Sequence, residues 1–169
     1  MSETLARTSA DGSQGGAPAP QQRRRPAWLT PVNLTIIIIT LLALILRVYY
    51  QYTRPGFLLG VTEYDDGPYF GSAVRLVHGS IPYRDFVLVQ PPGITLLMSP
   101  AGLLTYWTGT AWGLAIGRIL TVLAGTAGVA LAGLLVRHRG LLAVLLTCGI
   151  VAVYADGVAA AHTVLVEPW

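Results

Sequence analysis

The segment 31–50 constrains this chain more than any other stretch of its sequence. It reads PVNLTIIIITLLALILRVYY and carries no charge before Arg47. Thr30 and Pro31 supply a helix start, because a hydroxyl side chain caps a helix and proline suits its first turn. At 1.5 Å per residue such a helix spans about 30 Å, the thickness of the hydrocarbon core of a bilayer. We therefore expect a transmembrane helix, with Arg47 snorkelling outward and tyrosines anchoring its end at the interface.

The composition of the whole chain also indicates a membrane protein. Of its 169 residues, 53% are hydrophobic and 11% are charged, whereas soluble domains carry about 25% charged residues. The net charge of +3 is modest, and no basic stretch alternates with aromatic residues, which argues against nucleic-acid binding. The single cysteine, Cys148, lies in an apolar run, so we expect it to be a small buried residue without a disulfide.

Further apolar segments predict that the chain is an all-α polytopic membrane protein. The runs 110–136 and 141–156 predict two more transmembrane helices, which gives about three spans in total. Residues 67–78 show a helical pattern of apolar and polar faces, as expected of a juxtamembrane helix in the interface. Ile94–Trp107 is too short to span and is interrupted by Pro100, so we expect it to lie along the outer interface.

Two arginine clusters predict the topology. Arg23–Arg25 and the Arg137/Arg139 turn both favour the cytoplasmic side, so an even number of crossings separates them. The loop 51–109 and the tail 157–169 are then outside. Residues 1–27, rich in small and polar types, predict a disordered cytoplasmic tail. We expect an integral protein of a bacterial plasma membrane with a cytoplasmic N-terminus, in contact with membrane lipids.

An acidic cluster, TEYDDGPYF, follows the first helix and contains Glu63, Asp65 and Asp66. Clustered carboxylates beside an apolar surface raise one another's pKa, or hold a cation or an arginine. A simpler alternative is that Asp65 or Asp66 caps the helix that starts at Gly67-Pro68. One residue can also serve both purposes.

Three arginines are candidates for binding an anion near the outer face: Arg75, Arg84 and Arg118. Arg84 precedes Asp85, so it either binds phosphate or forms a surface ion pair of little energetic value. Arg118 is the one charge in the run 110–136. It indicates a functional site unless it snorkels to the surface.

The two histidines of the outer segments, His78 and His162, match no zinc-binding spacing. We therefore expect no metal and no other cofactor.

The order of these features resembles the GT-C membrane glycosyltransferases, in particular the family of protein O-mannosyltransferases and the lipid A aminoarabinose transferase. After the first helix come Asp65-Asp66-Gly67, then PYFGSAVRLVHG, PYRDF, QPPG and GLAIGRILTVLAG, which is followed by VRHRG. The resemblance covers roughly residues 34–169. It implies that 28–169 is the N-terminal part of a larger transmembrane domain, inactive alone because the family core has many more helices.

The resemblance implies an inverting transfer of a sugar from a polyprenyl-phosphate carrier to an acceptor on the outer face. The aspartate of the family's first loop, the base or the residue that positions the acceptor, corresponds to Asp65. Asp66 stands where the family often has glutamate, and Gln90 where many members have histidine or lysine. Glu167 lies where relatives often carry a second acid. We expect Asp65 to be the base and Asp66 a helix cap, so that Asp66→Asn is tolerated better than Asp65→Asn.

A reading from another class is a non-enzymatic polytopic protein, such as a transporter fragment or an assembly subunit. Transporters more often place broken helices and ionisable residues at mid-membrane. Here the acidic residues, with Asp85 among them, concentrate in the segment predicted to lie outside. This distribution favours the glycosyltransferase.

Overall fold

The computed structural model describes residues 30–61 and 64–169. In these two ranges the regular elements are helices, apart from one isolated bridge between Pro82 and Phe86. The all-α expectation is therefore confirmed for this part of the chain. The predicted tail 1–27 and Glu63 lie outside the described residues.

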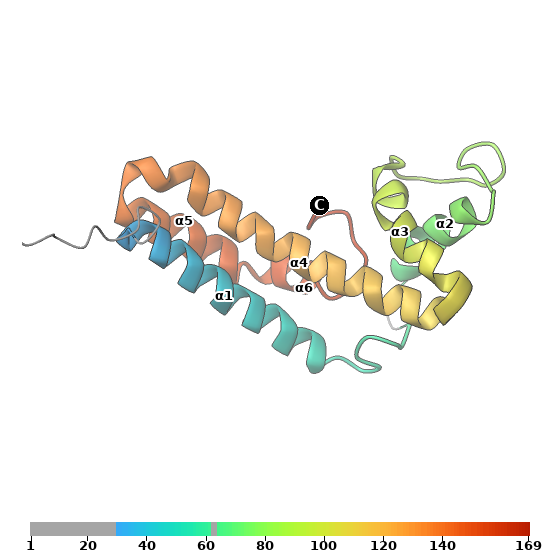
Figure 1. Ribbon diagram of the computed structural model, residues 1–169, viewed down its shortest axis with the longest axis horizontal. Coiled ribbons are helices and arrows are strands. Elements are labelled where there is room, and N and C mark those ends of the chain that lie inside the picture. Colours follow the sequence, from blue (N-terminus) through green and yellow to red (C-terminus); the bar gives the residue numbers. More distant parts are fainter. Residues whose placement is uncertain (1–29, 62–63) are drawn as a thin grey trace, which may run out of the picture.

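Three helices form an elongated bundle (Figure 1). They are α1 (Pro31–Tyr52), α4 (Thr110–Val136) and α5 (Leu141–Val153), each in contact with the other two. Helix α1 begins as its sequence predicts, because the Thr30 hydroxyl accepts a hydrogen bond from the backbone N–H of Asn33 at 3.2 Å. The short 3-10 turn η1 (Arg137–Arg139) lies at the same end of the bundle as the start of α1. Arg23–Arg25 lie outside the described residues, so the predicted even number of crossings between the two arginine clusters stays a prediction.

By length and composition, two helices in the described part of the chain could cross a membrane, Pro31–Tyr52 and Thr110–Arg139. The predicted third span, 141–156, is not one helix. Helix α5 has 13 residues, about 20 Å at 1.5 Å per residue, shorter than the hydrocarbon core of about 30 Å. Tyr154 then turns the backbone to φ −57°, ψ 114°, and the short helix α6 (Ala155–Ala160) follows. A count of three spans is not confirmed.

Small residues let the bundle helices approach closely. A Cβ atom added at Gly133 would lie 2.5 Å from the sulfur of Cys148 and 3.0 Å from Ile36. Cys148 and Ile36 belong to an apolar core that also contains Ala43 and Val129. Cys148 is thus a small buried residue, as the sequence predicted.

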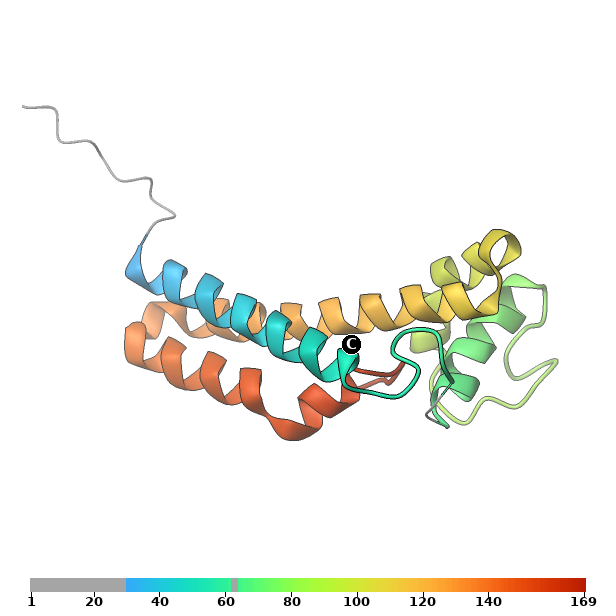
Figure 2. The same ribbon diagram turned by 90° about the horizontal axis from the view of Figure 1, so that it is seen from below.

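Two further helices pack beside the first part of α4, beyond the end of α1 (Figure 2). They are α2 (Asp66–Val77) and α3 (Gly93–Thr108), and they confirm helices where the sequence predicted them, over 67–78 and 94–107. Phe70, Met98 and Leu114 join them to α4 in a second apolar core. This packing fixes the start of α2, where the two aspartates lie. The position of α3 relative to a membrane stays a prediction.

Candidate functional site

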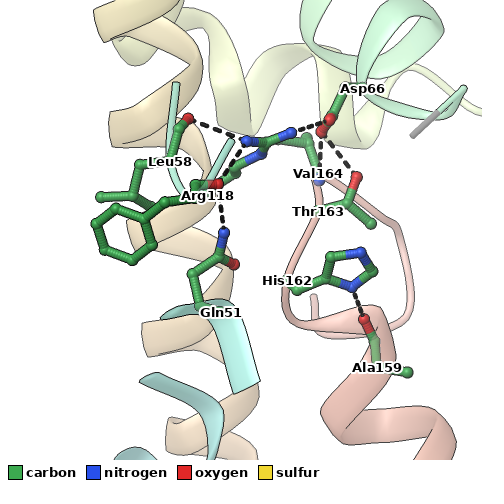
Figure 3. A network of polar contacts seen from close by, with 9 residues as sticks. Gln51, Leu58, Asp66, Arg118, Ala159, His162, Thr163 and Val164 are labelled. Carbon is green, nitrogen blue, oxygen red and sulfur yellow. Dashed lines mark hydrogen bonds and ion pairs between the residues drawn. The ribbon is translucent and has the colours of Figure 1, made fainter. Parts of the chain in front are cut away.

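A buried ion pair joins α2 to α4. Asp66 is the first residue of α2, and its carboxylate accepts a short hydrogen bond from Nη2 of Arg118. The side chains of Asp66 and Arg118 are 1% and 0% exposed. The other oxygen of the same carboxylate accepts hydrogen bonds from the Thr163 hydroxyl at 2.7 Å and the Val164 N–H at 3.1 Å. Figure 3 shows how this one carboxylate ties α2, α4 and the segment after α6 together.

Arg118 also holds the segment that follows α1. Its Nη1 donates to the carbonyl oxygens of Phe57 and Leu58, both at 3.0 Å. The amide of Gln51, near the end of α1, donates to the same Phe57 carbonyl at 2.9 Å (Figure 3). The guanidinium therefore sits at a junction of several segments, and Asp66 neutralises its charge. Its two terminal nitrogens make three hydrogen bonds, while its buried Nε has no hydrogen-bond partner.

One expectation about these residues is wrong, and one of the two alternatives for Arg118 is not observed. Asp66 was expected to cap α2, yet its carboxylate is committed to Arg118 and to the segment 163–164, and Asp65, at the N-cap position, makes no side-chain capping bond. Arg118 does not snorkel, because a buried carboxylate satisfies its charge where it lies. A buried charge is tolerated when it is both paired and hydrogen-bonded.

Asp65 lies on the wall of a different space. It is half-buried and lines a cavity of about 630 Å³ between α2 and the segment 86–90. Arg75, nearly three turns further along α2 at 3.6 residues per turn, lines the same cavity, and its guanidinium lies 5.3 Å from the centre of the Phe86 ring. The structure thus brings Asp65 and Arg75 to one cavity, whereas the buried Asp66 borders only the pocket on the other side of α2.

A second, mainly apolar pocket of about 410 Å³ lies on the other side of α2. Leu59, Phe70 and Leu114 line it, and it shares Arg75 with the first cavity. Gly67 and Gly71 also border both spaces, so this face of α2 has little side-chain bulk between them. A ligand with a charged middle and an apolar end could place each part in a suitable space.

Tyr69 is a cavity residue that the sequence reasoning missed. Burial raises the pKa of its hydroxyl, and the negative charges of Asp65 and Glu167 raise it further, against the opposing effect of a hydrogen bond with Gln90. At neutral pH the phenol is therefore a hydrogen-bond donor beside Asp65. Its position four residues after Asp65 on the predicted helix is the signal that could have found it.

The remaining predicted residues lie elsewhere. Arg84 and Asp85 form an exposed ion pair at 2.9 Å, which fits the surface-pair alternative. The hydrogen bonds from Arg84 and from the Ile81 N–H lower the pKa of Asp85. Glu167 is exposed and borders a small pocket beside Arg47. Within residues 30–61 and 64–169, no three His, Cys, Asp or Glu side chains gather where they could hold a metal ion.

Arg47 also departs from expectation. It was expected to snorkel outward, but it is 3% exposed and lies against α5, where its Nη1 donates to the Ala152 carbonyl at 3.4 Å. Helix α5 packs against α1, and its residue Ala152 supplies this carbonyl.

No family model, curated protein or solved structure matches this chain.

Proposed function

We propose that this chain forms part of a membrane glycosyltransferase that moves a sugar from a polyprenyl-phosphate donor to an acceptor on the outer face of the membrane, with inversion at the anomeric carbon. The observation that carries the proposal is that the two adjacent aspartates have different surroundings. Asp65 faces a cavity together with a cationic side chain, whereas Asp66 is held in a buried ion pair. The ordered sequence features that resemble the GT-C enzymes support the same function.

In the proposed reaction Asp65 is the general base. The acceptor hydroxyl attacks the anomeric carbon and gives its proton to the Asp65 carboxylate as the new glycosidic bond forms. The bond between the anomeric carbon and the phosphate oxygen breaks on the opposite face, and its electron pair leaves with the polyprenyl phosphate. A positioned carboxylate of this kind contributes roughly 10²–10⁴ in rate.

Arg75 is the residue we assign to the departing phosphate. It is the one arginine that borders both the polar cavity and the apolar pocket. A phosphate beside Arg75 would place the sugar toward Asp65 and the first isoprene units in the apolar pocket. Cationic groups fixed where negative charge develops lower the barrier of such a step. Arg84 and Arg118, the other two candidates, are already paired with Asp85 and Asp66.

The buried pair then has a positioning role. Asp66 and Arg118 fix the first turn of α2 against α4 and the segment 163–164. Asp65 directly precedes that turn. The Asp66–Arg118 pair therefore sets the direction from which the Asp65 carboxylate enters the cavity.

The test is a transfer assay on membranes from cells that make the protein from its complete gene. The donor is a polyprenyl-phosphate sugar with a radiolabelled sugar, and the readout is label in the acceptor fraction. We expect Asp65→Asn to lower the rate by about 10²–10⁴. Asp85→Asn is the matched control, an exposed carboxylate outside the cavity, and we expect it to keep the wild-type rate.

Thermal unfolding of the purified variants separates chemistry from folding, and we expect both to melt with the wild type. An unchanged rate in Asp65→Asn would remove it as the base. Wild-type membranes that transfer no label above a control without the gene would contradict the glycosyltransferase proposal and favour the non-enzymatic reading.

A further inference from the structure

Arg47 is a buried cation without a carboxylate partner in the described part of the chain. Its side chain is 3% exposed, and its Nη1 makes two long bonds to carbonyl oxygens, Ala43 at 3.3 Å and Ala152 at 3.4 Å. Its Nε is buried and has no hydrogen-bond partner. Arg118 also has a buried Nε without a hydrogen-bond partner, but its charge is neutralised by Asp66.

Arg47 borders an unfilled space. A pocket of about 160 Å³ lies beside it, bounded by α1, α4, α5, α6 and the segment 167–168. Gly125, Gly128 and Gly157 form much of its wall. A Cβ atom at Gly125 would lie 3.3 Å from Nε of Arg47. Glycine at this position therefore leaves room for the guanidinium between α1 and α4.

A buried charge is normally neutralised by a partner, because transferring an unpaired ion out of water is strongly unfavourable. Arg47 makes only neutral contacts within the described residues. Glu167 also borders the pocket, but it is exposed and forms no ion pair with Arg47. The missing partner is an anion that enters the pocket.

We propose that this pocket binds a phosphate group through Arg47. The planar guanidinium presents N–H groups in a fork that matches phosphate oxygens. The volume equals that of about five water molecules at roughly 30 Å³ each, which is enough for a phosphate group. Arg47 lies in the last two turns of a helix long enough to span a bilayer, so a lipid phosphate can reach this depth as well as free phosphate.

The site is separate from the cavity of Asp65 and does not depend on the proposed transfer reaction. Arg47 and Gly125 line neither of the two spaces beside α2. The exposed carboxylate of Glu167 lies at the border of the pocket, where it repels an incoming anion and lowers its affinity.

The test measures ligand binding to the purified chain in a neutral detergent. Three probes are added to the micelles: inorganic phosphate, dioleoyl phosphatidic acid, and dioleoylglycerol as the matched lipid without phosphate. Native mass spectrometry gives the stoichiometry, and the rise in melting temperature with probe concentration gives the affinity. We expect saturable binding of one phosphate probe per chain and none of dioleoylglycerol. Binding of phosphatidic acid alone identifies a lipid source, and binding of inorganic phosphate identifies a free one.

Four variants decide whether Arg47 is the binding residue. We expect Arg47→Gln to weaken binding roughly tenfold or more, the loss expected for a charge-assisted hydrogen bond. Arg137→Gln removes an exposed arginine at the other end of the bundle, and its affinity should equal that of the wild type. Gly125→Ala narrows the pocket without changing charge and should weaken binding.

Glu167→Gln should raise the affinity roughly two- to fivefold by removing the nearby negative charge. This exposed variant keeps the proposal testable if Arg47→Gln does not fold. Absence of binding by both phosphate probes would overturn the proposal. So would equal binding of dioleoylglycerol, wild-type affinity in Arg47→Gln, or an unchanged or lower affinity in Glu167→Gln.

Discussion

Breaking the Asp66–Arg118 pair by removing one partner should strongly destabilise this chain, because it leaves a buried charge unpaired. Asp66→Asn keeps the size and part of the hydrogen bonding of the side chain but removes its negative charge. Arg118 would then be a fully buried cation without a counter-charge. Removing one partner of a buried pair costs about 3–5 kcal/mol. The hydrogen bonds from Thr163 and Val164 become bonds to a neutral acceptor, which are weaker than bonds to a carboxylate.

The assay is reversible unfolding of the purified chain in detergent, followed by circular dichroism in a double-mutant cycle. Asp66→Asn and Arg118→Gln should each lower the free energy of unfolding by about 3–5 kcal/mol. The double variant should lose less than the sum by at least about 1 kcal/mol, because it leaves no buried charge unpaired. Arg84→Gln, at the exposed ion pair, is the control and should leave the melting temperature unchanged. Additive single effects, or an Asp66→Asn variant as stable as the wild type, would refute the reasoning.

Three further predictions concern topology and packing. In intact cells without the native cysteine, a cysteine at Ser80 should react with an impermeant reagent and one at His138 should be protected; the reverse pattern would contradict the topology. A fluorescent label at Leu97 should be quenched from the headgroup region, and quenching at mid-bilayer would place α3 inside the membrane. Gly133→Ala should lower stability by about 1–3 kcal/mol in the same unfolding assay, because the new methyl group meets a buried sulfur at 2.5 Å. Wild-type stability of Gly133→Ala would contradict this prediction, because α4 and α5 would then accommodate the methyl group at no cost.

The helices could be predicted from sequence because each has a local cause. An apolar run of sufficient length and a Thr-Pro start account for α1, and helical periodicity accounts for α2. The predicted third span is not confirmed, because hydropathy measures only how apolar a segment is. The run stays apolar through the bend at Tyr154, where the chain leaves α5 and begins α6. The first local sign of the bend is Asp156, in the first turn of α6.

The arginines could not be assigned from local sequence, because their surroundings are set by distant residues. The partner of Arg118 is 52 positions earlier in the chain, and the carbonyl that Arg47 contacts is 105 positions later. A snorkelling arginine and a buried arginine look alike within an apolar helix. Only the packing of α5 on α1, and of α2 on α4, decides between them.

The two aspartates of the cluster also have different surroundings because distant residues pack against only one of them. Successive residues of a helix point about 100° apart, so Asp65 and Asp66 cannot both face the core at the start of α2. The residue that faces inward is the one opposite Arg118, and the segment 163–164 supplies two more donors to it. Burial of Asp66 leaves Asp65 on the cavity side with Arg75. Of these two aspartates, Asp65 is therefore the one to which the proposed function assigns the chemistry, and damage from replacing Asp66 should be measured first as lost stability.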